Sequence, residues 1–136
     1  GRAAIYYSCK ADYEYSPNRI VSMAGPGLLE TFIDKFCALI GVSDRVKYGF
    51  EHQFHRHLDH RFADVNFTEF VKNVKVGGLI IHDEEDDVAP IEGARKMHAN
   101  WHDAEIATPN GCGHSLTGDL VPAIVVEYIA KSEKEG

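Results

Sequence analysis

The hydrophobic and polar positions of the chain follow two different periods. Apolar residues that return every three to four positions predict helices. These helices are expected at 2–13, 28–40, from 43 to about 60, from 90 or 91 to about 100, and from about 119 to 131. Short runs of consecutive apolar residues predict buried strands. The strands are expected at RIVSMAG, VGGLIIHD and AEIATP, and the segment FTEFVKNV is expected to add one or two helical turns.

Strands and helices alternate along most of the chain. Strands that alternate with helices of about 10 to 15 residues are typical of βαβ units, in which the strands are parallel. The predicted fold class is therefore α/β, a parallel sheet of about three strands with helices on both faces. With 136 residues the chain is long enough for one domain, and it contains no internal repeat.

Composition narrows the classes of partner. The net charge is −7, from 14 basic and 21 acidic side chains, which argues against nucleic acid or an anionic membrane surface as the main partner. No apolar run approaches the ~18 residues of a membrane-spanning helix, and the first residues do not follow a signal-peptide pattern. The three cysteines, Cys9, Cys37 and Cys112, are too few and too scattered for a disulfide framework. A reduced, cytoplasmic protein is therefore expected.

Reactive side chains follow two of the predicted strands. In open parallel sheets, functional groups gather at the carboxyl ends of the strands. The strand GLIIHD runs into EEDDVAP, and AEIATP runs into NGCGHS. An acid and a histidine at neighbouring strand ends suit a general base, because the carboxylate holds one ring nitrogen and stabilises the imidazolium. The other nitrogen then takes a proton from a nucleophile.

From Val76 to Lys131 the chain resembles the C-terminal part of an α/β-hydrolase. That family commonly carries a strand followed by H-G-x-x-D-x-x-V-P, then a helix, a strand, and G-x-G-H before a final helix. The matching segments are LIIHDEEDDVAP and GCGH. The resemblance implies that Asp86 is the catalytic acid and His114 the catalytic histidine. Two positions depart from the pattern, since Asp83 stands where the family often has glycine and Ala89 where it often has valine.

Ser115 lies in the segment GHSLT, which looks like the G-x-S-x-G elbow of a nucleophilic serine. The resemblance argues against that role, because in these enzymes the acid and the histidine follow the serine along the chain. No histidine follows His114, and Thr117 stands where the elbow favours glycine. Ser115 is therefore interpreted as a helix N-cap or a loop serine beside the catalytic histidine.

No G-x-S-x-G motif occurs in the chain. In the family the elbow is commonly followed by a helix of small residues, and the opening segment GRAAIYYSCK resembles such a helix. The resemblance then covers 1–136 as a single partial domain, with 27–73 as a variable helical cap. It places the serine and most of the oxyanion hole in sequence that precedes this chain. The strand at 19–25, which is internal in the family, is then expected to be an unpaired apolar edge.

Other clusters allow other interpretations. The segment HQFHRHLDH has the density of a metal site, with His52, His55, His57, His60 and Asp59. On a helix these histidines lie on two faces, so a solvated helix is the simpler interpretation. The acidic run 83–87 could bind Ca²⁺ or Mg²⁺, but it lacks the alternating spacing and the glycine of a calcium loop. Cys112 could be a reactive thiol, because it lies two residues before His114. Positions so close together on a turn seldom align for proton transfer, however. No metal and no cofactor is predicted.

The remaining side chains near the strands receive structural interpretations. His82 stands at the strand end where the family often has a histidine, and a structural role is expected for it. His98 and His102, together with Trp101, are expected at surface and edge positions of the helix before the last strand.

The function that the resemblance implies is hydrolysis of a small-molecule carboxylic ester or similar acyl compound by a Ser-Asp-His triad. Asp86 would orient His114, which would act first as general base and then as general acid. The alternative is a non-catalytic half-domain that completes its sheet with another chain or another copy. A homo-oligomer, or association with the N-terminal half of the fold, is expected.

Overall fold

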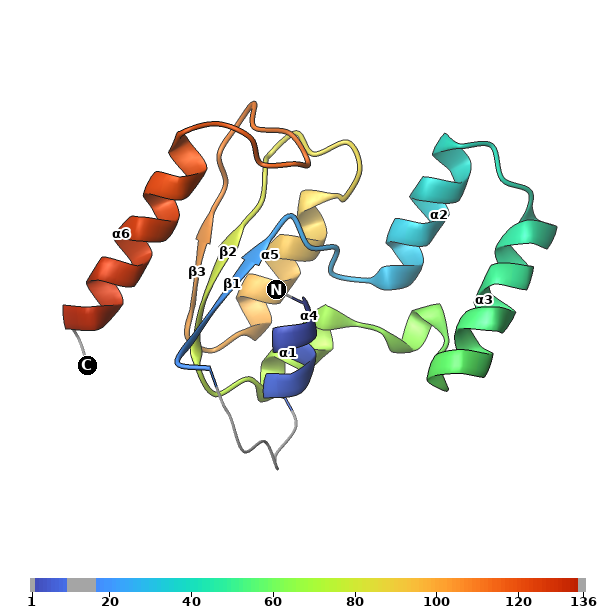
Figure 1. Cartoon of the computed structure of the whole chain (residues 1–136), viewed down its shortest axis with the longest axis horizontal. Coiled ribbons are helices and arrows are strands. Elements are labelled where there is room, and N and C mark those ends of the chain that lie inside the picture. The colour runs from blue at the N-terminus through green and yellow to red at the C-terminus, as the bar shows by residue number, and fades with distance from the viewer. Residues whose placement is uncertain (1, 10–16, 135–136) are drawn as a thin grey trace.

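The computed structural model describes residues 2–9 and 17–134 and centres on three parallel strands (Figure 1). The strands are β1 (Arg19–Met23), β2 (Gly77–Ile81) and β3 (Ala104–Ala107), and they lie in that order in one sheet. Ile20 of β1 pairs with Gly78 of β2, and Gly78 pairs in turn with Ala104 of β3. The three predicted strands are therefore present, and helices lie in the connections between them, as parallel pairing requires.

Helices cover both faces of the sheet (Figure 1). On one face lie α1 (Arg2–Ser8), α4 (Phe67–Phe70) and α5 (Ile91–Asn100), and on the other lies α6 (Leu120–Lys134). Successive side chains of β2 point to opposite faces of the sheet, so this strand contributes to two cores. Ile80 packs with α5, whereas Leu79 and Ile81 pack with α6. All of β2 is buried, as expected for a central parallel strand. Among the described residues, no helix has both the length and the apolar character that crossing a membrane requires.

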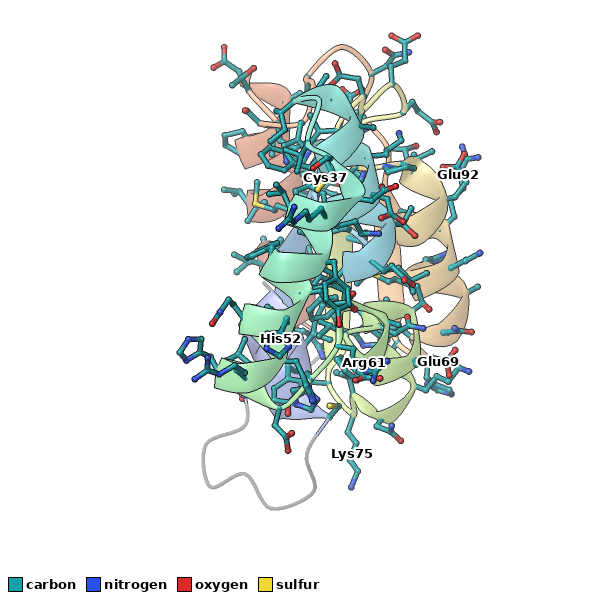
Figure 2. The ribbon with its side chains drawn as sticks, turned by 90° about the vertical axis from the view of Figure 1, so that its right-hand side faces the viewer. Cys37, His52, Arg61, Glu69, Lys75 and Glu92 are labelled. Carbon is teal, nitrogen blue, oxygen red and sulfur yellow. The ribbon has the colours of Figure 1, made fainter. Side chains whose placement is uncertain are left out.

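In the largely helical segment 27–73, the part up to residue 58 stands beside the sheet, whereas α4 packs on one face of it (Figure 1). Its elements are α2 (Leu29–Leu39), α3 (Asp44–Leu58), the 3-10 turn η1 (Phe62–Asp64), α4, and the 3-10 turn η2 (Val71–Asn73). Figure 2 shows this side of the molecule, with Cys37 on α2 and His52 on α3. Both helices and their junction leave large apolar side chains exposed: Phe36, Leu39, Ile40, Val46, Tyr48, Phe50 and Leu58. That this segment caps a substrate site stays a prediction.

An ion pair and a group of aromatic contacts hold the outer helices together and to the rest of the chain. Lys47 of α3 forms an ion pair with Asp34 of α2. The rings of Phe50 and Phe54 lie against Phe62 of η1, with centroid distances of 5.3 and 5.0 Å. Aromatic packing on η1 therefore anchors α3, which has no buried residue of its own.

Some element boundaries differ from the prediction. α1 ends at Ser8, and positions 10–13 of the helix predicted at 2–13 lie outside the described residues. α3 ends at Leu58 rather than near His60, because Asp59 adopts a left-handed conformation with φ of 54° and donates its N–H to His55 O. Ser43 stands at the N-cap position of α3, but its side chain makes no capping hydrogen bond.

Trp101 is buried, so the expectation of a surface or edge position is wrong. Only 2% of this residue is exposed. Its ring lies against Gly78 of β2 so closely that a Cβ atom at Gly78 would come within 2.2 Å of it. The indole Nε1–H donates to the carbonyl oxygen of Val76 at 2.9 Å. The absence of a side chain at Gly78 therefore makes the space that the tryptophan fills.

β1 forms the edge of the sheet within the described residues, where β2 is its one strand partner. Ile20 and Ser22 are buried, whereas Arg19 is exposed and Met23 is 47% exposed. An edge strand offers backbone N–H and C=O groups for pairing with another strand. Whether another chain uses this edge stays a prediction.

Candidate active site

The two loops that follow β2 and β3 run side by side at the carboxyl end of the sheet. Past the end of β2, the His82 N–H donates to Ala107 O at 3.1 Å and the Glu84 N–H donates to Pro109 O at 3.0 Å. The pairing of the strands therefore continues into the loops. This continuation brings the acidic segment after β2 against the glycine-rich segment after β3.

Asp86 and His114 meet where these loops converge. Oδ2 of Asp86 lies 2.9 Å from Nδ1 of His114, within the range of a charge-assisted hydrogen bond. The other carboxylate oxygen, Oδ1, accepts hydrogen bonds from the Val88 N–H at 2.9 Å and the Ala89 N–H at 2.8 Å. Asp86 is 7% exposed, whereas the His114 side chain is 33% exposed. The loop thus orients the carboxylate and leaves the imidazole partly open to solvent.

Asp86 carries a negative charge at neutral pH. Burial raises the pKa of this carboxyl, but the Ala89 N–H, the His114 ring and the Val88 N–H together lower it by more, so the pKa lies below its usual range. A carboxylate oxygen only accepts hydrogen bonds, so Nδ1 of His114 carries the hydrogen. In the neutral ring Nε2 is then the nitrogen with a free lone pair, which is the polarity that a general base needs.

His82 contacts the same carboxylate from the buried side. Its Nε2 atom lies 2.7 Å from the carbonyl oxygen of Ala89 and 3.2 Å from Oδ2 of Asp86. Both neighbours are acceptors, so Nε2 carries a hydrogen that points between them. Nδ1 of His82 is buried and has no hydrogen-bond partner among the described residues. These contacts tie the loop at Asp86 and Ala89 to the end of β2 and agree with the structural role expected for His82.

Asp83 is a second buried carboxylate in the same loop, 1% exposed. Oδ1 accepts a hydrogen bond from the Glu85 N–H at 2.8 Å, and Oδ2 accepts from the N–H groups of Cys112 and Gly113. The Glu85 N–H is the largest influence on its pKa and lowers it. Burial and the charge of Asp86 raise the pKa, but the Cys112 and Gly113 N–H groups help to keep it below the usual range. Asp83 therefore faces the backbone before His114 and not its ring.

The loop that carries His114 turns tightly. Gly111 and Gly113 have φ angles of 80° and 64°, in the left-handed region that favours glycine. The Leu116 N–H donates to Gly113 O at 3.0 Å, and the Leu116 side chain is buried in the core under α6. His114 is thus carried on a short turn with an apolar anchor just after it.

Ser115 lies exposed in this turn, next to His114. α6 begins only at Leu120, so Ser115 is a loop serine and not the N-cap of that helix. Thr117, rather than Ser115, bonds within the turn, since its N–H and hydroxyl both donate to Cys112 O.

The clusters considered for metal binding do not converge. Among residues 2–9 and 17–134, no group of three or more His, Cys, Asp and Glu side chains is arranged to hold a metal ion. His52 and His55 line a shallow hollow on α3 together with Tyr48, Glu51 and Arg61. In the acidic run, Asp83 and Asp86 accept hydrogen bonds from backbone N–H groups, whereas Asp87 is exposed.

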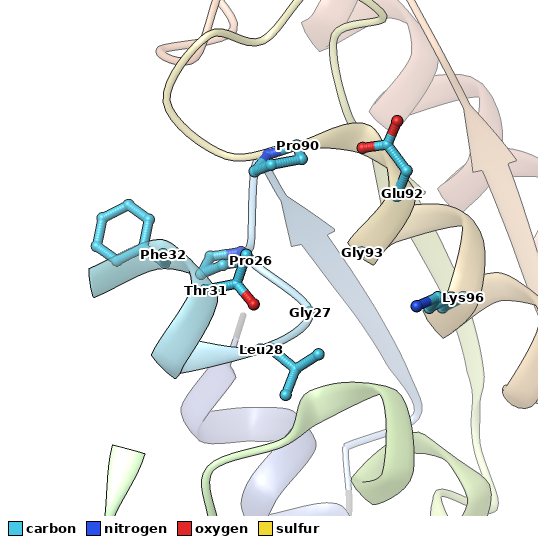
Figure 3. A pocket seen from close by; sticks show the side chains of 9 residues that line it. All are labelled: Pro26, Gly27, Leu28, Thr31, Phe32, Pro90, Glu92, Gly93 and Lys96. Carbon is cyan, nitrogen blue, oxygen red and sulfur yellow. The ribbon is translucent and has the colours of Figure 1, made fainter. Parts of the chain in front are cut away.

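A hollow of about 110 Å³ lies between the starts of α2 and α5 (Figure 3). Its lining residues are Pro26, Gly27, Leu28, Thr31, Phe32, Pro90, Glu92, Gly93 and Lys96. Gly27 and Gly93 are in backbone contact here, since a Cβ atom on Gly27 would lie 2.8 Å from the Cα atom of Gly93. Asp86 and His114 do not line this hollow, so it forms the seam between 27–73 and the sheet domain rather than part of the candidate site.

By structure the chain is similar to known α/β-hydrolases. An esterase from Pyrococcus furiosus, in two crystal forms, matches 98% of this chain and 49% of its own, with TM-scores of 0.63 and 0.66 at 13% and 14% identity. A meta-cleavage product hydrolase from Pseudomonas fluorescens IP01 matches 98% of this chain and 61% of its own, with a TM-score of 0.58 at 19% identity. No protein-family model and no curated protein matches the sequence.

These likenesses show the fold. The chain has part of an α/β-hydrolase fold, with a three-stranded parallel sheet flanked by helices, which confirms the predicted fold class. It spans 49% of the length of the esterase and 61% of the length of the hydrolase.

Two contributors to the site lie outside the residues that the motif comparison selected. Asp83 holds the backbone before His114, and His82 supplies a second contact to Asp86. The position of both residues in the sequence is a weak signal of their burial, because they directly follow a buried apolar strand. The sequence contains no signal for the Cys112 and Gly113 N–H groups as partners of Asp83, because they lie on another loop.

Proposed function

We propose that this chain supplies the acid and the general base of a serine hydrolase that acts on a small-molecule carboxylic ester or a related acyl compound. The single observation that supports the proposal is the Asp86–His114 hydrogen bond of 2.9 Å between the loops that follow two adjacent parallel strands. The fold shared with an esterase and another hydrolase adds to it.

In this proposal Asp86 keeps Nδ1 of His114 protonated and stabilises the imidazolium that forms during the reaction. Nε2 takes the proton of the serine hydroxyl as that oxygen attacks the acyl carbon. The same nitrogen then gives the proton to the departing alcohol, and a water molecule repeats the cycle on the acyl-enzyme. His114 suits this exchange because its side chain is partly exposed while its partner carboxylate is buried.

The nucleophile is proposed to come from a segment outside these 136 residues, because no G-x-S-x-G motif occurs in them. Ser115 does not suit the role, since neighbouring side chains on one turn diverge and the acid precedes it in the chain. The oxyanion hole would come largely from the same outside segment.

The test is to express the reading frame of this chain together with any segment that precedes it and to assay short p-nitrophenyl esters. We expect saturable hydrolysis that the His114→Ala substitution abolishes and that the matched His102→Ala substitution, at an exposed histidine, leaves intact. Equal activity in the His114→Ala protein would overturn the proposal. A reading frame that contains no nucleophile-bearing segment would favour the second candidate function.

The second candidate is a non-catalytic half-domain that completes its sheet with a second copy or with another chain. The supporting observation is the edge position of β1, whose last residue, Met23, is exposed. The apolar side chains exposed along α2 and α3 add surface that a partner could cover.

We also propose a reducing, cytoplasmic setting for the protein. The supporting observation is that Cys9, Cys37 and Cys112 are all free. Mass spectrometry of the protein from its native source, after thiol blocking, would reveal any disulfide that contradicts this setting.

A further inference from the structure

Asp83 is a buried carboxylate that the proposed reaction does not use. Within the described residues, its hydrogen bonds run only to backbone N–H groups. The Glu85 N–H donates to Oδ1 at 2.8 Å, and the N–H groups of Cys112 and Gly113 donate to Oδ2 at 2.5 and 2.9 Å. Asp83 and Asp86, both in the loop after β2, therefore contact the loop after β3. Only Asp86 contacts the imidazole of His114.

The backbone that Asp83 holds leads directly into His114. Cys112 and Gly113 are the two residues before it, and Gly111 and Gly113 adopt positive φ angles. A glycine-rich turn has many accessible conformations, so its shape depends on the contacts made to it. Each peptide unit is planar, and fixing two successive N–H groups therefore fixes the direction in which the chain enters His114.

The chemistry of the contact suits an ionised carboxylate. Three N–H donors converge on Asp83, and both oxygens of a carboxylate only accept. An asparagine at this position would keep one acceptor oxygen but place an NH₂ donor against at least one of the N–H groups. Hydrogen bonds to an ionised acceptor are also stronger than those to a neutral amide.

We propose that Asp83 is a positioning residue of the candidate site, which holds the turn at 111–113 so that the ring of His114 meets Asp86. The catalytic consequence rests on the proposed function, whereas the effect of Asp83 on the ring position does not. Loss of the Asp83 contact would remove neither Asp86 nor His114, but it would widen the range of distances between their side chains.

The first experiment follows backbone amide and histidine ring signals of the unaltered chain by NMR. As the pH is lowered, the amide signals of Glu85, Cys112 and Gly113 should shift together in one acid step. That step should lie below the usual midpoint of an aspartate, about 3.9. Three amides that shift at different pH values, or that do not respond to acid, would contradict the shared contact.

The second experiment compares Asp83→Asn with Asp87→Asn, which makes the same charge change at an exposed position of the same loop. In Asp83→Asn, amide hydrogen exchange at Cys112 and Gly113 should accelerate by about tenfold or more relative to exchange elsewhere in the chain. The far-downfield signal of the His114 Nδ1 proton, which reports its bond to Asp86, should weaken or disappear. Asp87→Asn should leave both readouts unchanged.

The outcomes separate three possibilities. If Asp83→Asn leaves the Nδ1 proton signal and the local exchange rates unchanged, Asp83 does not position His114. If exchange accelerates equally throughout the chain, Asp83 supports the fold in general and the proposal is wrong. If the unaltered chain lacks the Nδ1 proton signal while the three amides titrate together, Asp83 holds the turn but the ring does not meet Asp86, so both the positioning role and the proposed function fail. Should Asp83→Asn not fold, the amide exchange and the Nδ1 proton signal are measured in Asp83→Gly instead, with the same expected changes. The amide titration of the unaltered chain tests the Asp83 contact without any substitution.

Discussion

Nδ1 of His114 and Oδ2 of Asp86 lie 2.9 Å apart across 28 positions of sequence. The two residues belong to loops that follow adjacent parallel strands, and backbone hydrogen bonds extend the strand pairing into those loops. The carboxylate is buried and has two backbone donors of its own, while the imidazole is partly exposed. The sheet therefore holds a carboxylate–imidazole pair at its carboxyl end, with the imidazole partly open to solvent.

In a polypeptide that also carries the nucleophile, Asp86→Asn should lower turnover by about 10⁴-fold, because an amide does not hold the imidazole in the required tautomer. Steady-state kinetics with a p-nitrophenyl ester measure the effect, and circular dichroism checks that the fold is retained. Asp87→Asn is the matched control and should keep near-normal activity, since Asp87 is exposed. Comparable turnover in the Asp86→Asn and Asp87→Asn proteins would remove Asp86 from the mechanism.

The chain of 136 residues on its own should show no saturable hydrolysis of short p-nitrophenyl esters, since no elbow serine occurs in it. A fluorophosphonate probe should likewise leave it unlabelled. Covalent labelling at Ser115 that is lost in Ser115→Ala would assign the nucleophile to this turn and overturn the chain order argued above.

Replacement of His82 should loosen the acid loop. His82→Phe keeps a buried ring but removes the Nε2–H that serves Ala89 O and Asp86 Oδ2. We expect the free energy of unfolding to fall by about 1–3 kcal/mol, the cost of leaving a buried acceptor unsatisfied. Urea unfolding measures this loss. The control His102→Phe changes the same side chain at an exposed position and should have little effect on stability.

The same His82→Phe substitution should raise the pKa of Asp86, because it removes a polar N–H that lies 3.2 Å from Oδ2 of the ionised carboxylate. The carboxyl carbon of Asp86, followed by NMR through an acid titration, reports this change. A pKa that stays the same or falls would show that His82 does not stabilise the Asp86 carboxylate.

Acid should destabilise the folded chain through Asp83 and Asp86. Both pKa values are lower in the folded chain than the usual aspartate value. The folded state therefore binds these protons more weakly than the unfolded state. Their stabilising contribution is complete above the unfolded-state pKa of about 3.9 and is lost as the pH falls through the lower folded-state values.

Urea unfolding between about pH 2 and 7 measures this dependence. The free energy of unfolding should decrease with falling pH below about pH 5, and Asp86→Asn should make that decrease less steep. Asp87→Asn should retain the slope of the unaltered chain. A slope that is the same in Asp86→Asn and in the unaltered chain would contradict the lowered pKa of Asp86.

The edge strand should promote association. β1 has a strand partner on one side among the described residues, and the exposed Met23 side chain adds apolar surface to that edge. Light scattering over a concentration series should show a mass that rises above that of one chain. Met23→Lys should shift association to higher concentration, whereas Val126→Lys, at an exposed apolar position on α6, should shift it less. A monomer at high concentration with slow amide exchange at residues 20–24 would mean that the edge is covered internally.

The alternation of strands and helices could be predicted from sequence because side-chain direction repeats every two residues in a strand and every 3.6 in a helix. That local pattern is sufficient to locate β1, β2 and β3 and most of the helices. It also placed an acidic run after one strand and a histidine after another, and the resemblance to α/β-hydrolases then singled out Asp86 and His114. Parallel pairing then requires those strand ends to share one edge of the sheet.

Only the tertiary structure decided which atoms of the two loops meet. Asp83 accepts hydrogen bonds from N–H groups 29 and 30 positions away, and Nε2 of His82 lies 3.2 Å from Oδ2 of Asp86. These contacts depend on the pairing of β2 with β3 and on positive φ angles in the glycine-rich turn, neither of which alters the hydrophobic period. The burial of Trp101 has the same origin, since its space exists because Gly78 has no side chain. Periodicity reports which face a residue occupies, whereas the partner on that face is selected by the packing of distant segments.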